Sequence, residues 1–262
     1  ATASAILHHP GVQADVAEIS PQMVEAARFF APWNARILEN PRMNLRVLDA
    51  REFLLLTRKR YDVIASEPTN IWVPGVANLF TREFYQVARS RLQPGGLFAQ
   101  WLHSYVADAP MMASVITTLR EEFPYVSAWL VGDADLILLA SDQRPRFEPE
   151  RFAQRLAALG PSFDVPQEKH PNRLALFRDP VLFLAHQIGT AESVALTWPR
   201  LAPTNSDKRP RLEFQAARAQ YRGAPFRIRD LMDGRVDPLG TEPLFLEEYL
   251  RRYPMGPDAR LR

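Results

Sequence analysis

The sequence predicts an α/β fold with a doubly wound, mainly parallel sheet and a less regular C-terminal part. The first observation is that short apolar segments alternate with amphipathic helical segments over residues 1–140. The second is that proline and glycine separate these segments, as at Pro94-Gly95-Gly96. The third is a chain of 262 residues, 47% of them hydrophobic, which is enough for a substantial core. Strands that alternate with helices form right-handed βαβ units, and such units build parallel sheets.

The elements of the first half follow from helix start signals and from periodicity. Ser20 before Pro21 gives an N-cap followed by proline at the first helical position. Thr81 is a second N-cap, and it places Glu83 in the first turn, where a negative charge is favourable. Strands are expected at 15–19, 45–48, 61–66 and 97–102, and helices at 1–9, 51–57 and 109–123 as well as after Ser20 and Thr81.

Two β-rich runs at 126–131 and 136–140 are expected to form an antiparallel hairpin at the edge of the sheet. Polar residues and prolines then cluster at 141–149, and we place a domain boundary there. The sequence thus predicts a first domain over 1–145 and a helical and irregular C-terminal extension over 146–262. Within the extension, helices are expected at 150–159 and 181–188, a short strand at 211–214 and partly extended chain at 225–262.

The composition excludes several classes of function. The chain has no cysteine, so disulfides, thiolate metal sites and cysteine nucleophiles are excluded, and a reducing, cytoplasmic location is expected. The formal net charge of +2 is too small to indicate a nucleic-acid partner. His170 and His186 lack ligand partners at useful spacing, so no metal is expected. No apolar run approaches the roughly 18 residues of a membrane span.

Three carboxylates follow three successive strands of the expected sheet. Glu18, Asp49 and Glu67 each lie at or just after the carboxyl end of a strand, where open parallel sheets bind ligands. An ionised carboxylate offers only acceptors, so Glu18 suits a pair of ribose hydroxyls and Asp49 suits an adenine amino group. Glu67 is then the candidate for chemistry on a second substrate. The alternative is that each acidic residue only forms a turn or caps a helix.

A glycine-rich nucleotide loop would normally accompany such carboxylates, but the chain contains no GxG sequence. The segment at 1–9 is the helix that would follow such a loop. We therefore expect the first strand and its glycine loop to lie upstream of Ala1. The alternative is a sheet that never had this strand.

A series of motifs carries a resemblance to a known family. They are DVAEISP (15–21), NPR (40–42), DAREFL (49–54), YDVI (61–64), NLFTREFY (78–85), LQPGG (92–96) and QWL (100–102). Residues 1 to about 140 resemble the spermidine synthase (polyamine aminopropyltransferase) family, which has the class I S-adenosylmethionine-dependent methyltransferase fold. The later segment NSDKRPRLEF (205–214) resembles a tail segment of the spermidine synthase-like branch.

The resemblance implies a role for individual residues. Glu18 would bind the ribose of decarboxylated S-adenosylmethionine, and Asp49, with Ala50 beside it, would bind the adenine. Glu67 falls where the family has a catalytic Asp that deprotonates and orients the attacking amine. Asn70 falls where a second acidic residue normally binds the polyamine. Leu79 would line the site together with Phe80.

Trp72 is a further candidate from its residue type, because an indole beside Glu67 can stack on a base or a cation. His103, after the strand ending at Leu102, is either a second proton carrier or a structural histidine that forms hydrogen bonds. Trp101 is expected in the core.

The sequence also departs from the family pattern, and this leaves three functions open. Glu67 is one methylene longer than Asp, and Asn70 carries no charge to attract a polyamine. The leading hypothesis is aminopropyl transfer from decarboxylated S-adenosylmethionine to a polyamine or other amine. The second is S-adenosylmethionine-dependent methyl transfer, and the third is a non-catalytic module of the same fold. A homodimer, and a membrane tether through upstream residues, stay open.

Overall fold

A computed structural model describes residues 2–105, 107–131, 135–159, 179–197, 202–222 and 244–254. Contacts between residues divide the chain into two compact units. Unit 1 comprises Ala1–Thr57 and Glu148–Phe183, and unit 2 comprises Arg58–Phe147 and Leu184–Arg262. Each unit is described by itself.

Unit 1 is built around a pair of parallel strands, in which Ala14 lies opposite Met43 and Glu18 lies opposite Val47. The side chain of Ser20 accepts a hydrogen bond from the Met23 amide at 3.2 Å, which confirms the expected N-cap. The elements are α1 (Thr2–Leu7), β1 (Ala14–Glu18), α2 (Pro21–Phe29), η1 (Ile37–Glu39), β2 (Met43–Val47), α3 (Ala50–Leu56) and α6 (Pro149–Leu159), and α8 (Pro180–Leu184) begins in this unit.

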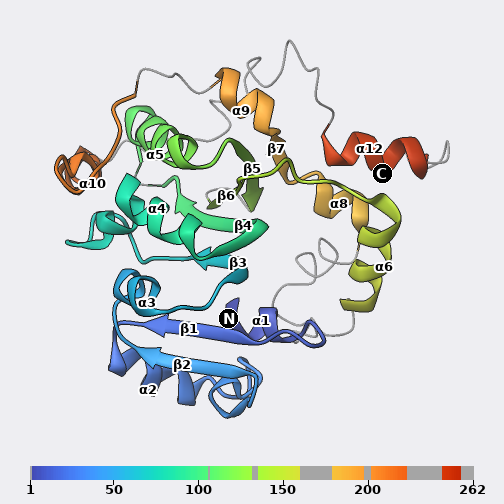
Figure 1. Cartoon of the computed structure of the whole chain (residues 1–262), viewed down its shortest axis with the longest axis horizontal. Coiled ribbons are helices and arrows are strands. Elements are labelled where there is room, and N and C mark those ends of the chain that lie inside the picture. The colour runs from blue at the N-terminus through green and yellow to red at the C-terminus, as the bar shows by residue number, and fades with distance from the viewer. Residues whose placement is uncertain are drawn as a thin grey trace. The chain divides into compact units, whose positions relative to one another are not determined.

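Unit 2 contains a five-stranded sheet with the strand order β3-β4-β6-β5-β7 (Figure 1). Its strands are β3 (Tyr61–Ser66), β4 (Leu92–His103), β5 (Tyr125–Val131), β6 (Asp135–Ser141) and β7 (Gln187–Gly189). Its helices are η2 (Val76–Phe80), α4 (Arg82–Ser90), α5 (Ala109–Glu122), α9 (Ala191–Thr197), α10 (Arg211–Arg222) and α12 (Phe245–Arg252).

The sheet of unit 2 is mixed, so the expectation of a mainly parallel sheet is wrong, although the α/β class is confirmed. Among the described strands of this unit, only β3 and β4 pair in parallel, whereas β4–β6, β5–β6 and β5–β7 are antiparallel. Three residues separate β5 from β6, which is far too few for a parallel crossover. The hairpin is therefore antiparallel, as expected, while its residues 132–134 lie outside the described part of the chain.

The core of unit 2 lies between the sheet and two helices that pack side by side, α4 and α5 (Figure 1). The ring of Phe98 from β4 stacks on Phe123 at 5.6 Å between centroids and meets Phe84 of α4 edge-on. The side chains of Thr81 and Asp108 accept amide hydrogen bonds in the first turns of α4 and α5. Local caps and a shared aromatic core thus fix both helices beside the sheet.

Other expectations differ in the second half of the chain. The expected strand at 211–214 is wrong, because these residues begin α10, where the Asn205 side-chain oxygen accepts the Leu212 amide at 3.2 Å. The expected helix at 181–188 ends early as α8, and the chain continues into β7. The stretch 225–262 is expected to be partly extended, but its residues Phe245–Arg252 form α12. Residues 223–243 and 255–262 lie outside the described part, so the expectation stays a prediction there. The proposed boundary between 1–145 and 146–262 also stays a prediction.

Candidate functional site

In unit 1, Glu18 and Asp49, the two carboxylates expected to bind the sulfonium substrate, lie on neighbouring segments at the carboxyl ends of β1 and β2. The Leu48 amide donates to the Glu18 carbonyl at 3.1 Å, and Asp49 follows directly. The Glu18 carboxylate accepts the Ser20 amide at 2.8 Å through Oε1. The Asp49 carboxylate accepts the Glu52 amide at 2.9 Å through Oδ1 and so caps α3, of which Ala50 is the first residue.

Each of these carboxylates uses one oxygen for local structure. Among the residues that the structure describes, the second oxygens, Glu18 Oε2 and Asp49 Oδ2, have no hydrogen-bond partner. Both side chains are half-buried. A carboxylate oxygen of this kind accepts hydrogen bonds and cannot donate them, so the pair fits hydroxyl and amino donors such as those of a nucleoside. The local capping roles and a ligand-binding role are therefore compatible.

In unit 2, Glu67 begins the loop that joins β3 to α4, which we call the β3–α4 loop (residues 67–81). Ser66 lies opposite Gln100 in the parallel pair β3–β4, and the Gln100 side chain donates to the Ser66 carbonyl at 3.3 Å. The carboxyl ends of the two strands are thus tied together. Glu67 is exposed just beyond this point. Residues that follow β3 and residues that follow β4 therefore meet at one edge of the sheet.

Asn70 and Trp72 of the β3–α4 loop both contact Tyr105, which follows β4. The Tyr105 hydroxyl donates to Asn70 Oδ1 at 2.6 Å. The Trp72 ring lies edge-on to Tyr105 at 5.9 Å and to His103 at 4.9 Å between centroids. Burial, followed by the negative charge of Asp135, raises the pKa of Tyr105, so this phenol stays protonated and can donate. Two of the residues proposed for the amine site, Asn70 and Trp72, thus meet at one tyrosine.

His103 lies at the centre of this group, with Trp72, Trp101 and Tyr105 around it. Its side chain is 1% exposed, and neither ring nitrogen has a hydrogen-bond partner within the described residues. Burial lowers the pKa of His103 to about 4, although the Asp135 carboxylate opposes this shift. The imidazole is therefore neutral at pH 7. The alternative of a structural histidine that forms hydrogen bonds therefore has no support within the described residues.

Two further candidates are Leu79 and Trp101. Leu79 lies half-buried in η2 next to the buried Phe80. Trp101, expected in the core, is only half-buried, and its indole donates to Asp135 at 3.2 Å. Sequence reasoning missed Tyr105. Its signal was an aromatic residue just beyond a strand that ends at the same edge as Glu67.

Two features are absent from the described residues. They contain no group of three or more His, Cys, Asp or Glu side chains arranged to hold a metal ion. None of the helices in the described ranges is both long enough and apolar enough to cross a bilayer.

Comparison with known families adds a decisive observation. The model of the spermine/spermidine synthase domain matches residues 1–131, which is half of the chain. The chain belongs to the spermine/spermidine synthase family. The matched residues include Glu18 and Asp49 of unit 1 and the whole β3–α4 loop of unit 2.

Curated relatives of this family member are polyamine aminopropyltransferases. The protein from Nitrosomonas europaea is 31% identical over 131 residues, which cover 49% of this chain and 40% of that protein. Polyamine aminopropyltransferase 2 of Pseudomonas aeruginosa is 32% identical over 151 residues, which cover 54% of this chain and 43% of that protein. The chain thus spans less than half the length of these relatives.

Two solved structures are similar to this spermidine synthase family member. The spermidine synthase of Thermotoga maritima is 23% identical, with 55% of this chain and 52% of that chain covered and a TM-score of 0.48. Human methyltransferase-like protein 13, in complex with SAH, is 23% identical, with 62% and 76% covered and a TM-score of 0.49.

Proposed function

We propose that this protein is a transferase that moves an aminopropyl group from decarboxylated S-adenosylmethionine to an amine. The observation that carries the proposal is the position of Glu67, which follows β3 and begins the loop that holds Asn70 and Trp72. Family membership and the polyamine aminopropyltransferase relatives support it. A cytoplasmic location belongs to the same proposal and rests on the family alone.

The donor would be bound by the carboxylates of unit 1. Glu18 would accept hydrogen bonds from the two ribose hydroxyls, and Asp49 would accept one from the adenine amino group, because both are acceptor-only groups. The first turn of α3, which begins at Ala50, would lie along the base. The sulfonium of the donor supplies the leaving group, since its carbon–sulfur bond breaks with the electron pair returning to sulfur.

The acceptor chemistry would take place at Glu67. An amine is mostly an ammonium ion at pH 7 and must lose a proton before its nitrogen can attack. The Glu67 carboxylate would attract the ammonium, accept its proton and aim the lone pair at the carbon next to the sulfonium. A carbon–nitrogen bond forms, the carbon–sulfur bond breaks, and the products are a longer amine and a neutral thioether. The aromatic rings of Trp72 and Tyr105 would cover the alkyl part of the amine and exclude water.

A second candidate function is methyl transfer from S-adenosylmethionine, and the side chain at position 70 favours it. Asn70 is uncharged and accepts a hydrogen bond from Tyr105, and His103, whose ring contacts Tyr105, is neutral. A polycation would gain from a second carboxylate here, whereas an acceptor without a second positive charge would not.

Calorimetric titration with the two sulfonium donors, side by side, tests the proposal. We expect the protein to bind decarboxylated S-adenosylmethionine more tightly than S-adenosylmethionine. The opposite order would replace aminopropyl transfer by methyl transfer. Binding of neither donor would leave a non-catalytic module of the same family. Donor binding followed by formation of the thioether with a diamine would establish the transfer itself.

A further inference from the structure

We propose that a tail segment (residues 203–213) is a positioning element for the β3–α4 loop, with Asn205 and Glu213 as its positioning residues. This inference rests on the proposed function in so far as the β3–α4 loop receives the acceptor. The tail segment follows the loop by more than 100 residues in the sequence, yet both belong to unit 2. It contains all but the last residue of the NSDKRPRLEF sequence (205–214), to which the proposed chemistry assigns no role.

Asn205 is a fully buried polar residue whose hydrogen-bonding groups reach several segments. Its backbone amide donates to the Thr118 hydroxyl of α5 at 2.9 Å, and its backbone carbonyl accepts the Arg82 backbone amide of α4 at 2.9 Å. Its side-chain nitrogen donates to the Phe80 carbonyl at 3.1 Å and the Ala77 carbonyl at 3.4 Å, both in η2. Its side-chain oxygen accepts an amide of α10, so every polar group of this residue has a partner.

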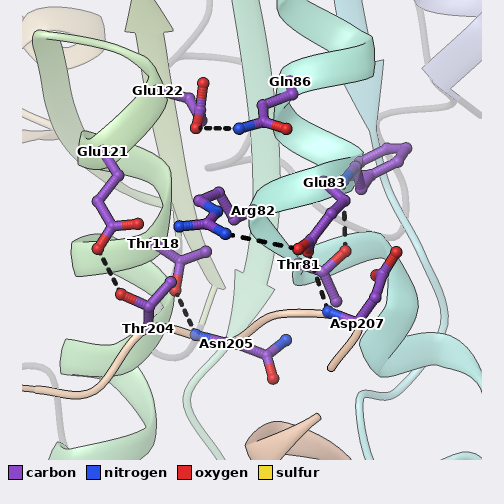
Figure 2. Close-up of polar contacts among 11 residues, drawn as sticks. Thr81, Arg82, Glu83, Gln86, Thr118, Glu121, Glu122, Thr204, Asn205 and Asp207 are labelled. Atoms are coloured by element: carbon purple, nitrogen blue, oxygen red, sulfur yellow. Dashed lines mark hydrogen bonds and ion pairs between the residues drawn. The ribbon is translucent and has the colours of Figure 1, made fainter. Parts of the chain in front are cut away.

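The residues beside Asn205 attach the tail segment to α4 and α5 (Figure 2). Figure 2 shows Thr204 bound to Glu121 of α5, and the Asp207 amide bound to Glu83 of α4 at 2.9 Å. The Pro203 carbonyl accepts a hydrogen bond from the Ser114 hydroxyl of α5 at 2.7 Å. The segment is therefore attached on both sides of Asn205, which gives the asparagine a fixed place from which to hold η2.

Glu213 connects the tail segment to the part of the loop that precedes η2. The Gly75 amide donates to both carboxylate oxygens of Glu213, at 3.1 Å and 3.4 Å. Gly75 adopts a left-handed φ of 87° at the start of η2, a conformation that glycine accepts without strain. Glu213 lies in the first turn of α10, whose start is fixed by Asn205. Glu213 therefore binds the start of η2, and Asn205 binds the carbonyls of η2 itself.

Backbone hydrogen bonds connect Gly75 to the residues proposed to bind the amine. The Val76 amide donates to the Val73 carbonyl at 3.1 Å, and the Val73 amide donates to the Asn70 carbonyl at 2.9 Å. These consecutive turns include Trp72 and place Asn70 against Tyr105. Holding Gly75 and η2 thus restricts the turns that present Asn70 and Trp72. Val73, Pro74 and Gly75 are exposed, so burial does not hold this part of the loop in place.

Hydrogen–deuterium exchange on the whole chain tests the inference through Glu213→Ala, since a variant of the fully buried Asn205 can fail to fold. We expect the amide exchange rates across residues 70–78 to rise about fivefold, which is the effect expected from the loss of one hydrogen bond. Glu213→Gln keeps one acceptor oxygen and should restore most of the protection. Gln86→Ala is the matched control, because it removes an exposed hydrogen bond between α4 and α5 that does not touch the loop.

The urea unfolding midpoints of Glu213→Ala and Gln86→Ala should agree, which separates positioning from global stability. Unchanged exchange at 70–78, or an equal rise in β4 and β6, would overturn the inference. In a transfer assay, Glu213→Ala should raise the KM for the amine several-fold and leave donor affinity unchanged, and an unchanged amine KM would also overturn it. If the wild-type protein transfers no aminopropyl group, the proposed function fails, and the exchange result still decides whether the tail orders the loop.

Discussion

The hydroxyl of Tyr105 donates a hydrogen bond to the side-chain oxygen of Asn70 at 2.6 Å and thereby joins the segment after β4 to the loop after β3. The amide at position 70 is thus fixed with its oxygen towards the phenol. A carboxylate at this position could accept the same hydrogen bond and would add a negative charge. Under the proposed function, the side chain at position 70 would therefore set the preference between singly and doubly charged amines.

The first prediction concerns Asn70→Asp. We expect the KM for a diamine to fall by up to about fivefold relative to that for a monoamine of equal length, because an exposed ion pair contributes about 0.2–1 kcal/mol. Tyr105 can still donate to the new side chain, so the loop should keep its structure. Transfer kinetics with 1,4-diaminobutane and butylamine, at low and high salt, would measure the ratio of the two KM values. Asn78→Asp, an exposed change in the same loop, is the control, and an equal gain for both amines would contradict the prediction.

The second prediction concerns the pH dependence of stability that His103 produces. An unfolded histidine titrates near 6.5, whereas burial lowers the pKa of His103 to about 4. Between these values the unfolded chain binds a proton that the folded chain does not. The stability from the neutral imidazole is therefore complete above pH 6.5 and is lost as the pH falls towards 4, by up to about 3 kcal/mol.

Urea unfolding of the wild-type protein and of His103→Leu at pH 7 and pH 4.5 checks this second prediction. The wild-type protein should lose about 2–3 kcal/mol more than the variant between the two pH values. His9→Gln, a change at an exposed histidine, should follow the wild-type curve. Parallel curves for the wild-type protein and His103→Leu would mean that His103 does not titrate differently in the folded state.

The third prediction separates the two roles of Asp49. Asn caps a helix about as well as Asp, so Asp49→Asn should change the free energy of unfolding by less than about 0.5 kcal/mol. Its amide nitrogen would replace the second acceptor oxygen, so donor affinity should fall about tenfold. Asp49→Ala should lose both the cap, at about 1 kcal/mol, and the affinity. Calorimetric titration and urea unfolding measure the two effects, and a full donor affinity in Asp49→Asn would remove Asp49 from the donor site.

The features that could be predicted from the sequence are those encoded by neighbouring residues. Ser20, Asp49 and Thr81 cap helices in the structure as their residue types indicate, because a cap needs only its own helix. Glu18 ends β1 and Glu67 follows β3, so each lies at the carboxyl end of a parallel strand pair of its own unit. These signals are short in range, so no knowledge of distant residues is required.

The features that escaped prediction depend on distant partners. The run RLEF at 211–214 is apolar enough for a short strand, and its helical state depends on Asn205 and on packing against η2. β7 has only three residues and exists through its pairing with β5. The bonds of Asn205 to η2 span more than 120 residues. No local pattern specifies such contacts, and the parts of the candidate site that depend on them required the structure.

The last prediction concerns Glu67→Gln. If Glu67 accepts the proton of the attacking amine, its amide variant should lose at least about a hundredfold in kcat, the usual contribution of a general base. Donor affinity should not change, because Glu67 acts on the acceptor. Glu25→Gln, an exposed change on α2, should leave both quantities unchanged. Because a glutamine cannot take up the proton, deprotonated amine should partly rescue the variant at high pH, with a rate that rises as the amine loses its proton. A Glu67→Gln protein that transfers the aminopropyl group at the wild-type rate would show that another group accepts the proton.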